Sequence, residues 1–386
     1  IFTFFSSFGQ SFFLGLFNES IRSELDITHG QFGSIYAAAT LLSSIILIWV
    51  GKKIDDFDVL KFSYFVILLL AVSTFIFSKI NSVEFFFIAI LLIRFSGQGM
   101  MSHTATTTIS RYFTNTRGKA LSTGWFGLSS AEFLLPITII YALTVIDWRN
   151  IWIIITIFIV LFLPMVSYFL VKEIKLSSRE NDIKFIKNNI KNWKRSEVIR
   201  DYRFIIVALN MLAMPCIVTG IFVYQSFILM SKNWGEYVIA QSFMVYSVSS
   251  VLTLFVAGYL IDKFTSRKLL IYMNIPLLIS LLILIYFQSP ISSFFFLGLI
   301  GLSNGFANVL GSSTWAELYG VKFIGSIKAL SGALMVFSTA FGTAFFGLLI
   351  DLNFSLEQIS VICSAYILIS LLLLLLIKNK LNPTIV

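Results

Sequence analysis

The sequence places two opposite charges inside long apolar stretches. Arg94 lies in an apolar run that ends near Ser110, and Glu132 lies near the middle of the next apolar run. A charged side chain at the centre of a bilayer costs about 2.5 to 3.5 kcal/mol on insertion scales, so both residues are functional candidates. Arg94 could bind an anionic solute, and Glu132 could hold a proton when it is desolvated and release it when Arg94 approaches.

A short basic segment between the two runs predicts that both charges lie at one depth. It reads Arg111-Tyr-Phe-Thr-Asn-Thr-Arg117-Gly-Lys119 and is typical of the loop of a transmembrane helical hairpin. Arg94 is seventeen residues from Arg111, and Glu132 is fifteen from Arg117, which corresponds to roughly 25 Å and roughly 22 Å of helix. We expect a structural ion pair, a substrate or proton site, or both.

The composition indicates an integral membrane protein. Of 386 residues, 58% are hydrophobic and only 12% are charged, whereas a soluble protein carries about 25% charged residues. Cys216 and Cys363 fall in apolar runs and lack disulfide or metal-ligand spacing. We therefore expect no metal and no cofactor. The formal charge of +9 would suit nucleic acid, but its distribution along the chain argues against that partner.

Apolar runs predict twelve membrane spans, and the basic residues orient them. The spans are expected at roughly 2–18, 31–50, 61–79, 83–110, 119–145, 150–171, 204–230, 237–260, 268–287, 291–316, 327–350 and 357–377. If both termini lie on one side, that side holds 23 of the 28 Lys and Arg residues. Basic residues gather in cytoplasmic loops, so both termini are expected in the cytoplasm.

Two short patterns recur along the chain at nearly one offset, which predicts a duplicated six-helix unit. A glycine and an aspartate four residues apart follow spans two and eight, as Gly51 with Asp55 and Gly258 with Asp262. Lys119-Ala-Leu-Ser also recurs as Lys328-Ala-Leu-Ser. The predicted fold is all-α, with twelve transmembrane helices in two pseudo-symmetric six-helix bundles. The expected domains are an N-terminal bundle (1–171), a basic cytoplasmic linker (172–203) and a C-terminal bundle (204–386).

These patterns resemble the major facilitator superfamily. The segment Gly258-Tyr-Leu-Ile-Asp-Lys-Phe-Thr-Ser-Arg-Lys268 is similar to the superfamily's charged loop signature, whereas the first copy has Asp56 in place of the usual base and Asp58 in place of the usual glycine. Arg94-Phe-Ser-Gly-Gln-Gly99 resembles its arginine-glycine motif in the fourth helix. The segments Gly97-Gln-Gly-Met-Met-Ser-His-Thr-Ala105, Arg111-Tyr-Phe and Arg117-Gly-Lys-Ala further resemble a bacterial branch near the monocarboxylate and oxalate/formate carriers.

The resemblance implies a secondary active transporter of the bacterial cytoplasmic (inner) membrane that works by alternating access. The expected substrate is a small organic anion, with protons as the candidate coupling ion and the lipid bilayer as surroundings; no oligomer is required. An alternative is a proton-coupled exporter of drugs or metabolites, although span five lacks the Gly-Pro motif that such exporters share. A membrane sensor that lost transport is a third reading. No nucleotide-binding loop or nucleophile–base pattern supports an enzyme.

Helical phase and motif position select the candidate site residues. The substrate-binding candidates are Arg94, Gln98, Gln10, Glu132, Ser129, Asn304, Asn308 and Tyr246. The gating candidates, charges at the inner ends of spans that could pair in only one state, are Asp55, Arg111, Asp262, Arg267 and Glu317. His103 is nine residues from Arg94 and is expected to face away as a packing histidine. Ser7, Gln10 and Ser11 are expected to share one face of the first helix.

Overall fold

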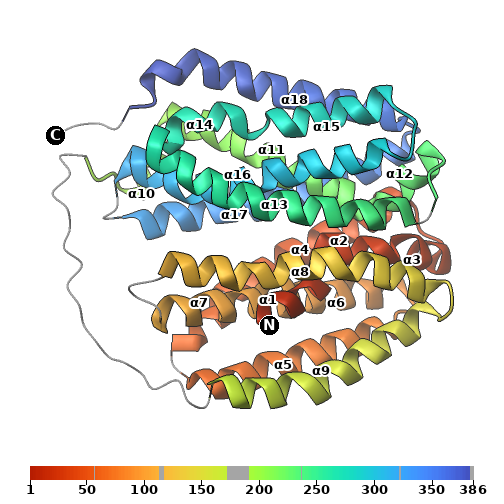
Figure 1. Ribbon diagram of the computed structural model, residues 1–386. Coiled ribbons are helices and arrows are strands. Elements are labelled where there is room, and N and C mark those ends of the chain that lie inside the picture. Colours follow the sequence, from red (N-terminus) through yellow and green to blue (C-terminus); the bar gives the residue numbers. More distant parts are fainter. Residues whose placement is uncertain (56, 113–116, 172–190, 236, 321–322, 383–386) are drawn as a thin grey trace. The chain divides into compact units, whose positions relative to one another are not determined.

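The computed structural model describes residues 1–55, 57–112, 117–171, 191–235, 237–320 and 323–382 (Figure 1). Within these ranges, the side chains of 52, 55, 110–112, 117–122, 170–171, 262, 312, 325–326 and 329 are outside the description. Every regular element of the described residues is a helix, and eleven of the helices are long and apolar enough to cross a membrane. The predicted all-α, multi-span membrane fold is confirmed.

The chain divides into two compact units. The first contains the described residues of Ile1–Glu180 together with Phe222–Phe227 and Thr343–Asp351. The second contains the described residues of Asn181–Ile221, Ile228–Gly342 and Leu352–Val386. Segments 222–227 and 343–351 therefore pack with residues that lie far away in the sequence.

Five long helical stretches and the interrupted first span build most of the first unit. They are α4 (His29–Val50), α5 (Val59–Phe77), α6 (Val83–Ile93) continued by η4 (Arg94–Met101) and α7 (Ser102–Tyr112), α8 (Arg117–Leu143) and α9 (Trp148–Val171), preceded by the short segments of the first span. Trp152 is completely buried and its ring packs on Phe13, Phe17 and Phe77. Aromatic packing of this kind fixes the first span against α5 and α9.

The first span is not the single helix that we predicted for residues 2–18. It consists of α1 (Phe2–Phe5), η1 (Ser6–Gly9), α2 (Ser11–Leu14) and η2 (Gly15–Phe17), and it leads into α3 (Asn18–Leu25). Gln10 has an extended backbone with φ −86° and ψ 153°, which interrupts the helix. Ser7 and Gln10 therefore do not share a helical face with Ser11. Within a membrane, such a break requires partners for the freed backbone groups.

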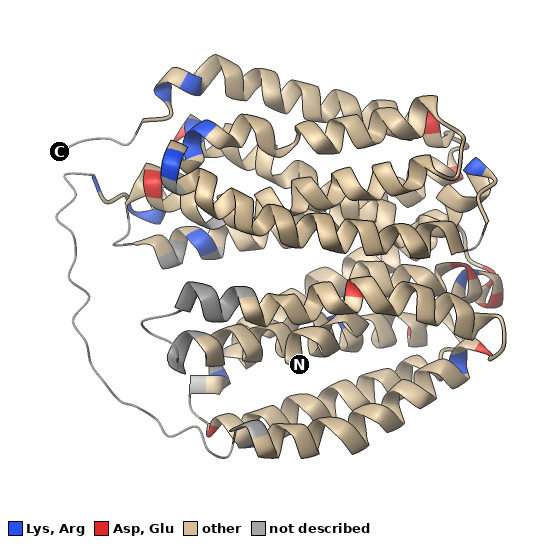
Figure 2. Cartoon of the chain, in the orientation of Figure 1, with Lys and Arg blue, Asp and Glu red and all other residues tan. Residues whose placement is uncertain are grey.

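The second unit is built around the packing of α13 (Tyr237–Phe264) on α16 (Ser292–Tyr319). Around this pair lie α11 (Tyr202–Val223), α14 (Ser266–Met273), α15 (Ile275–Tyr286), α17 (Ile324–Asp351) and α18 (Leu356–Ile377). The short helices α10 (Arg195–Val198), α12 (Gln225–Lys232) and η5 (Lys378–Lys380) connect or end these elements. In this unit, Lys and Arg residues gather at the end where α14 begins and η5 lies (Figure 2).

The outer faces of the helices carry large exposed apolar side chains. Leu161 and Phe169 on α9 are each 70% exposed, and Leu376 on α18 is 79% exposed. An apolar surface of this kind would be unfavourable in water and is typical of helices that face lipid.

Candidate functional site

Arg94 connects the break in the first span to α4. Its side chain is 1% exposed, and its Nη1 donates a hydrogen bond of 2.8 Å to the carbonyl oxygen of Gly9. Its Nε donates to Thr40 Oγ1 at 3.2 Å, and its guanidinium lies 5.1 Å from the centre of the Tyr36 ring. The Gly9 carbonyl precedes the extended Gln10, so Arg94 supplies a donor to a carbonyl that the helix break leaves without one.

The break packs against an irregular stretch of the fourth span. Residues Arg94–Met101 form a π-helix, an uncommon geometry that is frequent at functional sites. A Cβ atom added at Gly9 would lie 2.5 Å from the backbone nitrogen of Gln98 and 2.5 Å from the carbonyl oxygen of Ile93. A Cβ atom added at Gly97 would lie 2.7 Å from the backbone nitrogen of Gly9. Only glycine at both positions allows this approach of two backbones.

Gly9→Ala is expected to destabilise the protein, because the added methyl group overlaps backbone atoms that cannot turn away. The expected loss is about 1 to 3 kcal/mol of unfolding free energy. Thermal unfolding of purified protein in detergent measures it. Gly311→Ala is the matched control, since nothing lies within 4 Å of a Cβ at Gly311. Equal melting temperatures for Gly9→Ala and the control would contradict the close approach.

Glu132 on α8 is 7% exposed, and it has no hydrogen-bond or ion-pair partner among the described residues. The expected ion pair with Arg94 is not formed in this structure. Arg94 instead directs its donors toward Gly9 and Thr40, and the equal depth on which our expectation rested does not determine the direction of either side chain. A buried carboxylate without a partner is costly when ionised, which favours its protonated form.

The other predicted substrate residues of the first unit have mixed surroundings. Gln10 and Gln98 are partly exposed and belong to the two irregular stretches that approach each other. Ser129 is partly exposed on α8, one turn before Glu132. Arg94, Gln10 and Gln98 therefore gather around the helix break, whereas Ser129 belongs with Glu132.

In the second unit, the predicted residues lie on the packed pair α13 and α16. Asn304 Nδ2 donates to Ser250 Oγ at 2.9 Å, which is a cross-helix bond. Tyr246 is 3% exposed, and its carbonyl lies against Gly301 of α16. Asn308 is exposed. Of the three, Asn308 has the most accessible side chain for a ligand.

Two of the predicted gating residues meet. Arg267 Nε lies 3.5 Å from Glu317 Oε2, so the start of α14 contacts the last turns of α16. The side chains of Asp55, Arg111 and Asp262 lie outside the described residues, and their predicted pairing stays a prediction.

His103 has a packing contact. Its Nε2 lies 3.0 Å from the carbonyl oxygen of Gly51, at the end of α4. A carbonyl oxygen only accepts, so the imidazole donates this hydrogen bond. The contact agrees with our expectation of a packing histidine. The imidazole packs closely on Gly51, since a Cβ at that position would lie 3.3 Å from the ring.

Sequence reasoning missed a glycine-lined contact within the first unit. The Tyr224 hydroxyl lies 2.9 Å from the carbonyl oxygen of His29 and 3.1 Å from that of Thr343, so its single proton is shared between two acceptors. A Cβ at either Gly33 or Gly347 would overlap this hydroxyl. The only signal in the sequence was glycine in α4 and α17, which is also common in ordinary packing of membrane helices.

An aspartate reinforces the same contact. Asp351 Oδ2, at the end of α17, accepts hydrogen bonds from Thr28 Oγ1 at 2.6 Å and from the Gly30 N–H at 2.8 Å. Both donors lie at the start of α4, and a carboxylate at the first N–H groups of a helix is favoured by the helix dipole. Segments 28–33, 222–227 and 343–351 are thereby joined; we call this set the α4 collar.

The chain belongs to the Major Facilitator Superfamily, which it matches over residues 1–343. It is therefore a multi-pass membrane protein of the secondary-transporter class and not an enzyme. No curated protein matches the chain.

Solved structures of the same fold cover nearly the whole chain. A bacterial homolog of the human lysosomal transporter Spinster, in an inward-facing and occupied conformation, matches with a TM-score of 0.73 and 12% identity over 99% of this chain and 96% of that chain. The nucleoside transporter NupG matches with a TM-score of 0.71 and 11% identity over 98% of this chain and 97% of its own. At these identities the likeness concerns the fold.

Proposed function

We propose that this transporter moves a small organic anion across the bacterial cytoplasmic membrane, with a proton as the coupling ion. In this proposal the two halves, residues 1–171 and 204–386, rock around the substrate, residues 172–203 link them, and both termini are cytoplasmic. The resemblance of residues 97–119 to monocarboxylate and oxalate/formate carriers supports the anionic substrate.

The observation that carries the proposal is the uncompensated charge of Arg94. Its side chain is buried, and among the described residues its partners are a carbonyl, hydroxyl groups and an aromatic ring. These partners are neutral, so they leave its positive charge without a counter-ion among the described residues. At an effective dielectric constant of 20, a carboxylate 4 Å away would contribute about 4 kcal/mol. Arg94 therefore favours an anion at the helix break, next to the partly exposed Gln10.

Glu132 supplies the proton site in this mechanism. Protonated, it is neutral and stable in its buried position on α8. It can lose the proton when water reaches it or when an opposite charge approaches, because either change stabilises the carboxylate. One singly charged substrate anion and one proton then cross together without a net charge, which avoids the cost of moving a bare charge through the bilayer.

Alternating access also needs contacts that form in one state and break in another. Among the gating candidates proposed at the inner ends of the spans, Arg267 and Glu317 form an ion pair in the part of the chain that the structure describes. The α4 collar lies at the opposite ends of its helices, since Thr28 precedes α4 and Asp351 closes α17. We assign the collar to an outer gate of the transporter.

We expect Tyr224→Phe and Gly33→Ala to increase the population in which the collar is open. The first removes the phenol hydroxyl that bonds the two carbonyls, and the second places a methyl group where that hydroxyl lies. A loss of about 1.4 kcal/mol raises the open population about tenfold. The reporter is Ser226→Cys, which replaces a hydroxyl buried beside Tyr224, in a chain with Cys216 and Cys363 changed to serine. Faster maleimide labelling of this cysteine measures the opening.

Gly258→Ala is the matched control for the collar, since no atom lies within 4 Å of a Cβ at that position. Its labelling rate should equal that of the reporter chain alone. Unchanged labelling in both Tyr224→Phe and Gly33→Ala would mean that the collar is a fixed part of the fold and not a gate.

A thermal-shift screen tests the proposed substrate class. Purified protein is heated with small carboxylates, amino acids, sugars or cationic drugs, and a compound that binds the folded state raises the melting temperature by mass action. The proposal expects stabilisation by carboxylates. Stabilisation only by cationic compounds would favour the exporter reading instead.

A further inference from the structure

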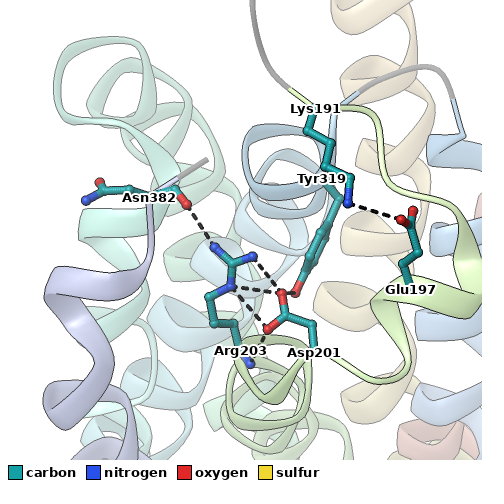
Figure 3. Close-up of polar contacts among 6 residues, drawn as sticks. All are labelled: Lys191, Glu197, Asp201, Arg203, Tyr319 and Asn382. Atoms are coloured by element: carbon teal, nitrogen blue, oxygen red, sulfur yellow. Dashed lines mark hydrogen bonds and ion pairs between the residues drawn. The ribbon is translucent and has the colours of Figure 1, made fainter. Parts of the chain in front are cut away.

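The last described residues of the chain are bound by two arginines. Arg267 Nη1 donates to the carbonyl oxygen of Leu381 and to Asn382 Oδ1, each at 2.9 Å. Arg203 Nη1 donates to the carbonyl oxygen of Asn382 at 3.0 Å (Figure 3). Asn382 Nδ2 donates to the Asn379 carbonyl at 3.1 Å, which leaves the amide oxygen for Arg267. Leu381 is 3% exposed and belongs to the apolar core of this end of the unit.

Arg267 also belongs to the pair at the end of α16. Its Nε lies 3.5 Å from Glu317 Oε2, while the backbone N–H groups of Ser266 and Arg267 donate to the two Glu317 oxygens at 2.9 and 3.3 Å. The Arg267 and Glu317 side chains are 21% and 28% exposed. A partly exposed ion pair of this length contributes only about 0 to 1 kcal/mol, so it orders the arginine weakly by itself.

Arg203 is held on its other side by a buried network. Asp201 Oδ2 lies 2.8 Å from the guanidinium and accepts a hydrogen bond from the Tyr319 hydroxyl at 3.1 Å (Figure 3). Tyr319 is completely buried, and its ring packs on Trp193 at 5.6 Å. Arg203 is therefore a fixed anchor at the start of α11, and it holds the Asn382 backbone in place.

The linker side of this network is ordered as well. The backbone N–H of Trp193 donates to the Tyr319 carbonyl at 3.0 Å. Lys191 Nζ forms an ion pair with Glu197 at 3.1 Å (Figure 3). The Lys194 backbone N–H, with the Lys191 ammonium, holds the pKa of the Glu197 carboxyl below its usual range. The end of the linker is thus bonded to Tyr319 on α16, two residues after Glu317.

We propose that Leu381–Asn382 is a strap that positions Arg267 for its contact with Glu317. The strap joins a rigid anchor, Arg203, to a weakly held gating arginine, so its loss would free the guanidinium of Arg267 without disturbing the buried network of Tyr319. Asn382 is in this sense a positioning residue. Its effect on transport rests on the proposed gating role of Arg267 and Glu317, whereas its effect on the position of Arg267 does not.

Hydrogen exchange of the full-length protein in detergent tests the strap. Asn382→Ala removes one acceptor of Arg267, so the Ser266 and Arg267 amides that Glu317 protects should exchange about tenfold faster, which is the effect of about 1.4 kcal/mol of lost protection. Asn382→Asp keeps an acceptor oxygen and should exchange at the wild-type rate. Lys380→Ala is the control, because Lys380 is exposed on the same tail and has no partner among the described residues.

Wild-type exchange of these amides in Asn382→Ala would overturn the strap, and so would equal acceleration by Lys380→Ala. Faster exchange of these amides in Asn382→Ala, together with wild-type exchange in Asn382→Asp, supports the strap. The readout needs no substrate, so its result stands whether or not the anion proposal holds. If Asn382→Ala accelerates exchange but leaves transport unchanged, the strap exists and the proposed gating role of Arg267 and Glu317 is wrong.

Discussion

Glu132→Gln is expected to abolish proton-driven accumulation of the solute and to leave exchange of labelled for unlabelled solute intact. Glutamine has nearly the shape of a protonated glutamate, so the buried position on α8 tolerates it. It cannot give up a proton, so the coupled cycle stops while the substrate-loaded carrier still moves. Proteoliposomes with an imposed pH gradient measure accumulation, and counterflow without a gradient measures exchange.

Glu19→Gln is the control for this experiment, because Glu19 is an exposed carboxylate on α3. Accumulation by the control should equal that of wild type. Full accumulation by Glu132→Gln would assign the buried carboxylate to structure and remove the proton site from the mechanism.

Arg94→Ala is expected to remove the stabilisation that carboxylates give to the wild-type protein. The change deletes the charge and leaves the Gly9 carbonyl without a donor, which costs about 1 to 3 kcal/mol of stability. The measurement is therefore the ligand-induced shift of each variant relative to its own ligand-free melting temperature. That difference separates lost binding from lost stability.

Arg94→Lys keeps the charge but cannot present the planar fork that reaches both Gly9 and Thr40. For Arg94→Lys we expect carboxylates to raise the melting temperature by an amount between those of wild type and Arg94→Ala. A full carboxylate shift in Arg94→Ala would leave Arg94 as a structural clamp on the helix break and place the anion elsewhere.

The membrane fold could be predicted from sequence because hydrophobicity alone determines most of it. Long apolar runs gave α4, α5, α9, α11 and α18 as spans, since each needs only its own residues to satisfy its backbone. The break at Gln10 could not be predicted in this way. It depends on Arg94 and on the Gly9–Gly97 approach, which join residues about ninety positions apart.

The candidate site was predicted in part. Burial of Arg94 and Glu132 follows from their position in apolar runs, and the structure confirms that both side chains are buried. Their expected pairing failed because equal depth on two helices does not fix the direction of the side chains, and Arg94 donates to Gly9 of the first span instead. The Tyr224 contact was missed because backbone carbonyls accept its bonds, and any residue type offers these.

The most direct measurement is proton flux in proteoliposomes that hold a pH-sensitive dye, when carboxylates, nucleosides, sugars or cationic drugs are added outside. Our account predicts that a small carboxylate acidifies the interior, that Glu132→Gln abolishes this acidification, and that Arg94→Ala reduces it. Acidification or alkalinisation only with neutral or cationic solutes, unchanged in both variants, would contradict an anion carrier that uses Arg94 and Glu132.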